Sequence, residues 1–557
     1  MRAVDVHCAD DWVTVGSAHV STPHDASEVA KRLDGVAGVA EVRAFATELR
    51  HPFALIVVAD DAVHCVTDHL RSIPIYYSVR NDRVRVGDAV QNLGVDRSGS
   101  TATVQSQAEF LATGYVHDDR TLCPTVEQTR AATVTTVDRR TGEVSTTPSY
   151  EYTVDPVDRG DAELRSELVA TLDTVVERLI READGRQLVV PLSGGYDSRL
   201  LLLLLVKHGY ENVLTYSHGR PGNAEATTAR AVAENLSVPW RFVDYRPADW
   251  RSLVRSAEYQ RYFSRAFNDD RLPGIVHMNW LAVRRLTRND VVDDDCLFLP
   301  GHTAATMAEH LTGAYESRER IPRDRVVDDL FEMNVWLWDL DDELTTMFRS
   351  QLSERLSVDG ERLTPTEAAT AYERWEWLER ESKWIHADLD VYRHFDVEYR
   401  VPFWDRTFVD FWQTVPLASR IDKRLLRAYT DELYVRYGGV DPSEATATEL
   451  DSVVRRGYYA LRDTPVFDLI RPLNSYLRYR KDPSGWPVAL PESTFARIYT
   501  GTENRHSFFT LEALGLLDFA SGDVTMAPIG GTLGREFVDR SRTAADRTAK
   551  WRLDGSR

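Results

Sequence analysis

Hydrophobic and polar residues alternate in short runs over the first 150 residues, which are rich in Val, Thr and Ala. The clearest runs lie at 53–58, 63–67 and 73–79. A period of two predicts β-strands. Asn81-Asp82 joins the third run to Val84-Arg85-Val86 and predicts a hairpin. We therefore expect a first domain built on antiparallel sheets.

The period changes from two to helical spacing after residue 160. Apolar residues recur every three or four positions over 162–181. Strand and helix patterns then alternate, as a strand at 187–192, a helix at 198–207, a strand at 213–217, a helix at about 224–235 and a strand at 241–245. This alternation predicts a doubly wound α/β domain, in which helices cover both faces of a parallel sheet.

Thr-rich and Asp-rich stretches over 131–160 indicate a domain boundary near residue 155. Residues 321–440 have helical spacing, whereas the segment after 440 matches no pattern that we can name. We divide the chain into a first domain at 1–154, a second at 155–440 and a C-terminal extension at 441–557, which we expect to be helical.

Composition limits the classes of function. The 557 residues contain 67 Lys and Arg against 87 Asp and Glu, a net charge of −20, which argues against a broad nucleic-acid-binding surface. The longest apolar run, 200–206, is far shorter than the roughly 20 residues of a membrane-spanning helix. The N-terminus lacks the basic-then-apolar order of a secretory signal, and the four cysteines form no CxxC motif. We expect a cytoplasmic protein that does not bind membranes, and leave its oligomeric state open.

The most informative segment is Ser193-Gly194-Gly195-Tyr196-Asp197-Ser198, which lies between a predicted strand and its helix. Two glycines allow a sharp turn that presents backbone N–H groups, and the helix start favours an anion such as pyrophosphate. The carboxylate of Asp197 is a suitable magnesium ligand. The alternative is a Gly-Gly turn that only connects the two elements.

Residues 191–198 resemble the SGGxDS pyrophosphate loop of the asparagine synthetase family, and the resemblance extends over about residues 50 to 435. Downstream, residues 398–405 are similar to the E-x-R-x-P-F-x-D segment of the family, and 422–427 to its E/D-K-x-x-L-R helix start. Upstream, residues 68–77 and 110–121 are similar to segments of its glutaminase domain. The resemblance implies an Ntn-hydrolase-like α+β sandwich, followed by an ATP pyrophosphatase domain of the adenine nucleotide α-hydrolase type.

The resemblance also implies a set of site residues. Lys423 occupies the position of the lysine that contacts the reacting phosphate, and only six of the 67 basic residues are lysines, which favours a function for it. A surface lysine at a helix start is the alternative. The positions implied to contact ATP are Pro191, Ser193, Gly194, Gly195, Asp197, Ser198, His218, Pro300 and Gly301.

Two departures from the family pattern matter. The family's class II glutaminase uses a cysteine next to Met1, but residue 2 is Arg2, and none of the four cysteines precedes a glycine as that nucleophile does. We expect a degenerate glutaminase domain without glutamine hydrolysis. Where the family has G-E-G-x-D-E, this chain has His302, a possible general base or a buried structural histidine, and Ala305 in place of a magnesium ligand. Three explanations stay open for the missing ligand at Ala305: Glu309 or Glu225 replaces it, magnesium is held more weakly, or the enzyme is impaired.

The sequence predicts an ATP-dependent and magnesium-dependent ligase that activates a carboxylate, aspartate or a related acid, as an acyl adenylate and transfers ammonia or an amine to it. A catalytically degenerate ATP-binding protein with a regulatory or scaffold role is the main alternative. A third hypothesis, a tRNA-modifying or NAD-forming enzyme with the same loop, fits the negative charge and the upstream domain less well. The acceptor and the amine donor stay open.

Overall fold

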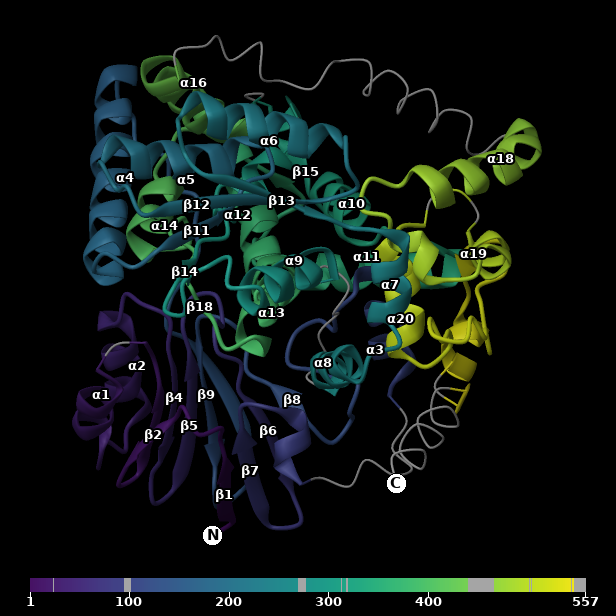
Figure 1. The fold of residues 1–557 in the computed structure, drawn as a ribbon. Coiled ribbons are helices and arrows are strands. Elements are labelled where there is room, and N and C mark those ends of the chain that lie inside the picture. Colours follow the sequence, from purple (N-terminus) through teal and green to yellow (C-terminus); the bar gives the residue numbers. More distant parts are fainter. Residues whose placement is uncertain are drawn as a thin grey trace.

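The computed structural model describes residues 1–23, 25–94, 102–268, 277–311, 313–316, 319–438, 465–499, 501, 503–541 and 543–544. Two sheets near the N-terminus form one lobe, a parallel sheet with its helices lies beside them, and the C-terminal helices lie at one side (Figure 1). The predicted boundary at residue 440 lies outside the described residues. None of the helices in the described ranges is both long and apolar enough to cross a membrane.

The first lobe contains a four-stranded and a six-stranded sheet. The four-stranded sheet has the order β1 (Ala3–His7), β7 (Arg83–Gly87), β6 (Tyr76–Arg80) and β8 (Glu127–Gln128). The six-stranded sheet has the order β10 (Val144–Pro148), β9 (Thr133–Asp138), β5 (Ala62–Thr67), β4 (Ala54–Val58), β3 (Ala18–Ser21) and β2 (Val13–Val15). All neighbouring pairs are antiparallel except β1 and β7, which run parallel.

The expectation of antiparallel pairing is therefore wrong for β1. This strand pairs with residues about 80 positions away, so no local turn signal reports its direction. The predicted hairpin at Asn81-Asp82 is confirmed, because both residues have positive φ angles (51° and 58°), as a type I′ turn requires. The strand predicted from residue 73 begins at Tyr76, since Pro74 has no N–H to donate to a ladder.

The alternating side chains of β4 explain the layers of this lobe. Ala54 and Ile56 face the four-stranded sheet, in a core shared with Val84 of β7. Leu55 and Val57 face the opposite way, in a core shared with α1 (Ala26–Leu33) and α2 (Val39–Glu48). The two sheets thus pack face to face, with helices outside the six-stranded one.

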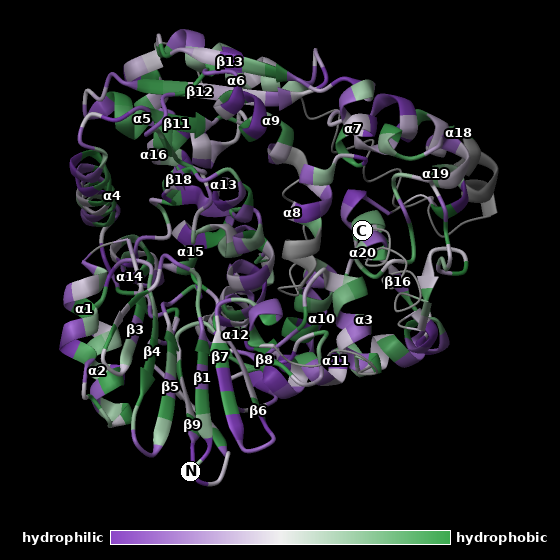
Figure 2. Cartoon of the chain, turned by 60° about the horizontal axis from the view of Figure 1, so that its bottom comes forward, coloured by the Kyte–Doolittle hydropathy of each residue, from purple (hydrophilic) through white to green (hydrophobic). Residues whose placement is uncertain are grey.

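The second lobe is built on a five-stranded sheet in which every neighbouring pair is parallel. Its order is β13 (Trp240–Asp244), β12 (Val213–Gly219), β11 (Leu188–Pro191), β14 (Leu297–Phe298) and β18 (Glu398–Tyr399). Leu188, Val189 and Val190 have no exposed surface, as expected of a strand covered on both faces. Figure 2 shows this hydrophobic interior along β11, β12 and α5.

Helices α4 (Asp161–Ala183), α5 (Tyr196–Lys207) and α6 (Ala224–Asn235) begin and end close to the predicted positions. Helices α7 (Pro247–Leu253), α8 (Ala257–Asn268) and α9 (His277–Arg288) were not predicted. The segment 321–440, expected to be helical without individual bounds, contains α10 (Arg323–Asn334), α11 (Asp342–Arg355), α12 (Pro365–Glu376), α13 (Asp390–His394), α14 (Arg406–Gln413), α15 (Leu417–Arg420) and α16 (Arg424–Gly438). A π-helix, Trp377–Ile385, continues α12 and was not predicted. The chain is thus a mixed α/β protein with a parallel sheet.

The C-terminal extension contains α18 (Pro465–Lys481), α19 (Glu492–Ile498), α20 (Arg505–Ala513) and the short strand β19 (Thr532–Leu533). Strand β19 pairs in parallel with β16 (Asp339–Leu340) of the second lobe. The Ser541 hydroxyl donates to Gln107 Oε1 on α3 (Val104–Thr113) of the first lobe, at 2.7 Å. The extension therefore contacts both lobes.

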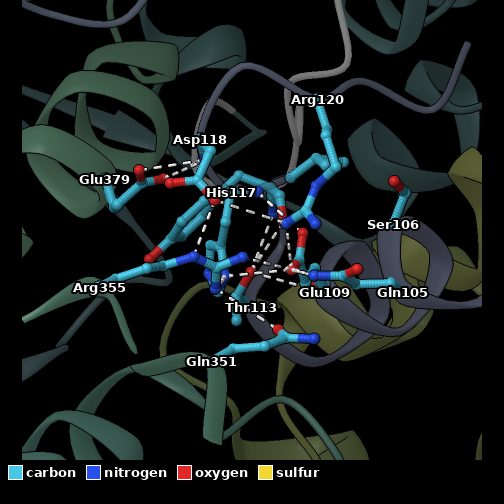
Figure 3. Close-up of polar contacts among 12 residues, drawn as sticks. Gln105, Ser106, Glu109, Thr113, His117, Asp118, Arg120, Gln351, Arg355 and Glu379 are labelled. Atoms are coloured by element: carbon cyan, nitrogen blue, oxygen red, sulfur yellow. Dashed lines mark hydrogen bonds and ion pairs between the residues drawn. The ribbon is translucent and has the colours of Figure 1, made fainter. Parts of the chain in front are cut away.

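Buried and half-buried charges join the two lobes in what we name the interface cluster: Glu109, His117, Asp118, Arg355, Glu379 and Lys383. Figure 3 shows the first five of these side chains. The Lys383 ammonium donates to Glu379 at 2.6 Å and to the carbonyl oxygens of Val116 and Asp118 at 2.9 and 2.8 Å, so all three of its protons have acceptors. The Asp118 carboxylate in turn pairs with Arg355 at 2.8 Å. The cluster fixes the 115–121 loop of the first lobe against the helices of the second.

Candidate functional site

The predicted pyrophosphate loop lies between β11 and α5, at the carboxyl end of the parallel sheet. Gly194 has φ 80°, and a Cβ atom there would lie 2.9 Å from Thr228 Cβ, so both its conformation and its space require glycine. Gly195 caps α5 without a side-chain cap, which leaves the first N–H groups of this 12-residue helix available to an anion. The geometry of this loop is suitable for binding an anion.

The hydroxyl groups of Ser193 and Ser198 lie 3.3 Å apart and close the loop from within. The Ser198 hydroxyl also accepts the Ser193 N–H at 3.3 Å. Gly301, just after β14, leaves room for this turn, because a Cβ there would lie 3.0 Å from Ser198 Cα. These contacts bring the predicted ATP-contact positions of β11 and β14 together.

Lys423 reaches this loop from between α15 and α16. Its side chain is 2% exposed, and its ammonium donates to Asp197 Oδ2 at 2.7 Å. Asp422 and Lys423 both have positive φ angles, 56° and 53°, which costs roughly 1–2 kcal/mol per non-glycine residue. Strain of this kind is typical of functional positions. The alternative of a surface lysine is therefore wrong.

Glu309 shares this lysine with Asp197. The Glu309 carboxylate lies 3.2 Å from the Lys423 ammonium, and Arg427 binds its other oxygen at 2.9 Å. Burial raises the pKa of Asp197, Lys423 opposes that change, and the charge of Glu309 adds to it. We name Asp197, Glu309 and Lys423 the loop cluster. The two carboxylates of the loop cluster both lie against the Lys423 ammonium, so their charges are coupled through it.

Of the two carboxylates considered as substitutes at Ala305, only Glu309 lies in the loop cluster. Glu225 is exposed on the first turn of α6, and no contact between it and Lys423 or Asp197 exists in the described part of the chain. Ala305 itself is fully buried and offers no ligand oxygen. The carboxylate that lies nearest Lys423 after Asp197 thus belongs to Glu309, four residues after Ala305.

The loop cluster is a suitable donor set for Mg²⁺ shared with phosphates. In the described ranges, no three His, Cys, Asp or Glu side chains are grouped as a metal cage. Magnesium is commonly bound by one or two carboxylates together with substrate phosphates. Asp197 and Glu309, both within 3.2 Å of one ammonium, provide such a pair.

His302 lies beside the loop cluster and not in a sealed core. Its Nε2 is 3.4 Å from Asp388 Oδ2, and its ring stacks on Trp404 with centroids 5.7 Å apart. Its side chain is 29% exposed, so the alternative of a buried structural histidine is not what the fold shows. The His302 ring thus lies beside a carboxylate and an indole and is not fully buried.

His218 lies on β12, at the same carboxyl end of the parallel sheet. Its ring stacks on Tyr245 at 5.0 Å, and burial lowers its pKa to about 4, so the imidazole is neutral near pH 7. Its Nδ1 is buried and has no hydrogen-bond partner among the described residues. Pro191 ends β11, and Pro300 follows β14, so both lie at this edge as well.

The residues at this edge lie within a segment that matches a known protein family. The family model described as asparagine synthase matches residues 167–434, which contain the loop, Lys423, His302 and Glu309. Residues 167–434 belong to the asparagine synthase family. The match supports an ATP-dependent, amide-forming ligase in general.

Two other comparisons add less. No curated protein matches the chain. Among solved structures, the chain is similar to a glutamine phosphoribosylpyrophosphate amidotransferase from B. subtilis complexed with ADP and GMP, at 10% identity and a TM-score of 0.15. The match covers 52% of this chain and 64% of that chain, so this chain spans less than two thirds of its length. At this TM-score the likeness says nothing about the site.

A cavity of about 940 Å³ lies between the first lobe and the asparagine synthase domain. Its lining includes Trp12 and Asp88 from the first lobe and Arg400 from the second, together with Trp404 and His386. The Trp404 ring stacks on His386 at 5.9 Å as well as on His302. One wall of this inter-lobe cavity is therefore the ring that supports the candidate base.

Several residues at this candidate site were not predicted from the sequence. Asp388, Arg427 and Thr306, whose hydroxyl lies 3.4 Å from the Lys423 ammonium, belong to it. Asp388 is 86 positions from His302, and no spacing rule links them. Arg427 falls within the lysine segment, one helical turn after Lys423, and this spacing is a signal that could have found it.

Proposed function

We propose that the protein is an ATP-dependent ligase that activates a carboxylate as an acyl adenylate and then forms an amide with ammonia or an amine, without hydrolysing glutamine. A carboxylate oxygen attacks the α-phosphorus of ATP, and the bond to pyrophosphate breaks. The nitrogen of the amine then attacks the acyl carbon, and AMP leaves. The partners are small molecules.

One observation carries the proposal: Lys423 is buried in a strained backbone and bonded to Asp197 of the pyrophosphate loop. A buried ammonium at that point stabilises negative charge that develops as pyrophosphate leaves. The N–H groups at the start of α5 add positive potential on the same side. Magnesium, when bound, would neutralise phosphate charge beside Asp197 and Glu309.

His302 is the group that we assign to the second step. A neutral imidazole accepts a proton from the attacking amine, and Asp388 at 3.4 Å stabilises the imidazolium that forms. The open side of the His302 ring gives an amine access to its nitrogen. An ordinary carboxylate in this position would be a weaker base near neutral pH.

The missing glutaminase nucleophile supports the use of free ammonia or an amine. Burial raises the pKa of the Cys65 thiol to about 12 and of Cys296 to about 11, and burial together with Asp88 raises that of Cys8 further. Thiols of this kind are not thiolates at neutral pH and are poor nucleophiles.

The test is ATP cleavage by the purified protein with magnesium and ammonium, scoring AMP and pyrophosphate separately from ADP. Aspartate and then pooled carboxylates serve as acceptors. AMP and pyrophosphate in equal amounts, absent in Asp197→Ala, support the proposal, and the stimulating acid names the substrate class. ADP and phosphate as the products would contradict it.

A second candidate function is an ATP-binding protein that has lost catalysis. Fully buried Ala305, at the position of a family magnesium ligand, is the observation that favours it. This candidate predicts magnesium-dependent ATP binding with no AMP from any carboxylate. Restoring the ligand by Ala305→Asp would then be the variant to examine for turnover.

A further inference from the structure

The C-terminal extension lies directly on the nucleotide edge of the parallel sheet. The Pro483 carbonyl accepts the Arg220 N–H at 2.8 Å, immediately after the end of β12. The Ser484 carbonyl accepts the Trp250 indole N–H at 2.9 Å. Gly219 has φ 123°, and a Cβ there would lie 3.1 Å from the Pro483 oxygen, so the strand end is shaped to receive this loop.

Helix α20 of the extension is anchored at the same side. The His506 ring packs edge-on against Trp384 of the π-helix, with centroids 4.8 Å apart. The Ser507 hydroxyl donates to the Leu337 carbonyl at 2.5 Å. These contacts fix the first turn of α20, and Arg505 is the first residue of that turn.

Arg505 is a cation without a partner at this edge. Its Nε is buried and has no hydrogen-bond acceptor among the described residues, and none of their carboxylates lies within 4.0 Å of its guanidinium. Burial lowers the pKa of its guanidinium, and the charges of Asp482, Asp388 and Glu225 oppose that change. A buried polar group in this state is costly unless a ligand satisfies it.

The charges that face Arg505 come from four elements: Asp482 in the loop after α18, Asp388 after the π-helix, Glu225 on α6 and Arg478 on α18. The Asp482 carboxylate is already engaged, because one oxygen accepts from the Ser484 N–H at 3.0 Å and the other pairs with Arg478 at 3.3 Å. It therefore does not serve as the partner of Arg505.

Two more polar atoms near the carboxyl end of the parallel sheet are unpartnered. Asp388 Oδ1 and His218 Nδ1 are both buried without a hydrogen-bond partner among the described residues. Burial lowers the pKa of His218, the charge of Asp388 opposes that change and the charge of Arg505 adds to it, so these three side chains lie close enough to interact. Three chain segments thus present unsatisfied atoms beside the loop edge.

We propose that Arg505 binds an anionic oxygen of the reactants, either the carboxylate of the acyl substrate or a phosphate of ATP, so that the C-terminal extension forms part of the active site. This inference rests on the proposed function for the identity of the anions. An arginine presents several donors to carboxylate or phosphate in a fixed plane, which suits either source.

The experiment measures binding of magnesium-ATP, inorganic pyrophosphate and aspartate separately, by calorimetry, to the wild type, Arg505→Gln, Arg505→Lys and Arg540→Gln. Arg540 is an exposed arginine of the same extension, 72% exposed, and serves as the matched control. We expect Arg505→Gln to weaken the binding of at least one anion about 10- to 100-fold. The affinity of Arg505→Lys should lie between those of Arg505→Gln and the wild type, and that of Arg540→Gln should equal the wild type. Weakened ATP and pyrophosphate binding assigns a phosphate, and weakened aspartate binding alone assigns a carboxylate.

A structural role for Arg505 gives a different result. Because its charge is uncompensated, removal should leave the melting temperature without ligand unchanged or higher. If Arg505→Gln melts at a lower temperature than the wild type, Arg505→Lys becomes the deciding variant, because it keeps the positive charge in a folded protein. Wild-type anion affinity in both Arg505→Gln and Arg505→Lys overturns the inference. A wild type that binds none of the three anions overturns it as well.

The two proposals fail in distinguishable ways. Loss of ATP binding in Asp197→Ala, with every anion bound normally by Arg505→Gln, overturns the role of Arg505 and leaves the ligase proposal standing. Anion binding that depends on Arg505, in a protein that forms no AMP, overturns the ligase proposal and leaves the anion site standing.

Discussion

The interface cluster and the loop cluster are both built from buried or half-buried charges, but they differ in how completely these are paired. In the interface cluster, the Lys383 ammonium has three acceptors and the Glu379 carboxylate accepts from Lys383 and from the Asp118 N–H. In the loop cluster, two carboxylates with side chains 30% exposed share one ammonium.

The difference teaches how to separate structural from functional charges in this fold. In the interface cluster the protein itself supplies the acceptors around Lys383, although His117 Nε2 is buried without a partner among the described residues, and the cluster holds the lobes together. A network with spare acceptors, next to a helix start and to unpartnered atoms of Asp388, His218 and Arg505, is completed only by other molecules. Substitutions that disrupt one cluster at a time should therefore have different effects.

The largest effect is expected at Lys423. Lys423→Ala removes the charge that stabilises the departing pyrophosphate and should lower AMP formation about 10²- to 10³-fold. The rate of AMP formation with the stimulating carboxylate is the measurement. Lys481→Ala, an exposed lysine of the extension, is the control and should keep the wild-type rate. A Lys423→Ala rate within threefold of the wild type would contradict the role.

Breaking the interface cluster should change stability and not chemistry. Burial acts to raise the pKa of Glu109, but His117, Arg120 and Arg355 together lower it to about 2, from an ordinary 4.5. The charged form therefore contributes on the order of 3 kcal/mol above pH 4.5, and this stability is lost as pH falls from 4.5 towards 2. Glu109→Gln should lower the free energy of unfolding, measured with urea at pH 7, and should remove this acid-sensitive component.

The control for that measurement is Glu316→Gln, which breaks a solvent-exposed ion pair with Arg424. Exposed pairs contribute little, so its unfolding curve should overlay the wild type. Equal curves for Glu109→Gln and the wild type would show that the interface cluster does not hold the lobes together.

His302→Gln separates the two chemical steps. The variant should keep the first burst of pyrophosphate, because the loop cluster is intact, while amide formation falls about 100-fold through loss of the base. Rapid-quench measurement of pyrophosphate and of amide product in one experiment checks both. Equal loss of the two products would place His302 in adenylation instead.

The smallest effect distinguishes Glu309 from Glu225. Glu309→Gln removes one carboxylate of the loop cluster and should weaken magnesium-dependent ATP binding about tenfold, the equivalent of one charge-assisted contact. Glu225→Gln should leave it unchanged. Titration of ATP at fixed magnesium, with and without chelator, gives both numbers, and the reverse order would refute the assignment of Glu309.

The sequence predicted the parts of the fold that local patterns determine. The strand, loop and helix around residues 188–207 follow from periodicity and two glycines, and the Asn81-Asp82 turn from local φ preferences. Pairing between distant segments, as for β1 with β7, depends on tertiary packing and leaves no local signal.

The site shows the same limit. Lys423 was found by its place in a motif, whereas Asp388 and Arg505 reach the edge from segments with no motif. Scarcity of lysine was a weaker guide than expected, because Lys383 and Lys207 are also retained, each in an ion pair with a carboxylate, at 2.6 Å, away from the loop. Three of the six lysines, Lys207, Lys383 and Lys423, lie in ion pairs, so burial in an ion pair does not by itself separate a lysine at the loop from a structural one.

The most direct test of the central claim, that the loop cluster is an adenylation centre, uses a carboxylate substrate labelled with ¹⁸O in both oxygens. Attack on the α-phosphorus followed by amide formation leaves one labelled oxygen on AMP. We predict AMP heavier by one ¹⁸O by mass spectrometry, with unlabelled pyrophosphate. Unlabelled AMP, or the label in inorganic phosphate with ADP as the other product, would contradict the account.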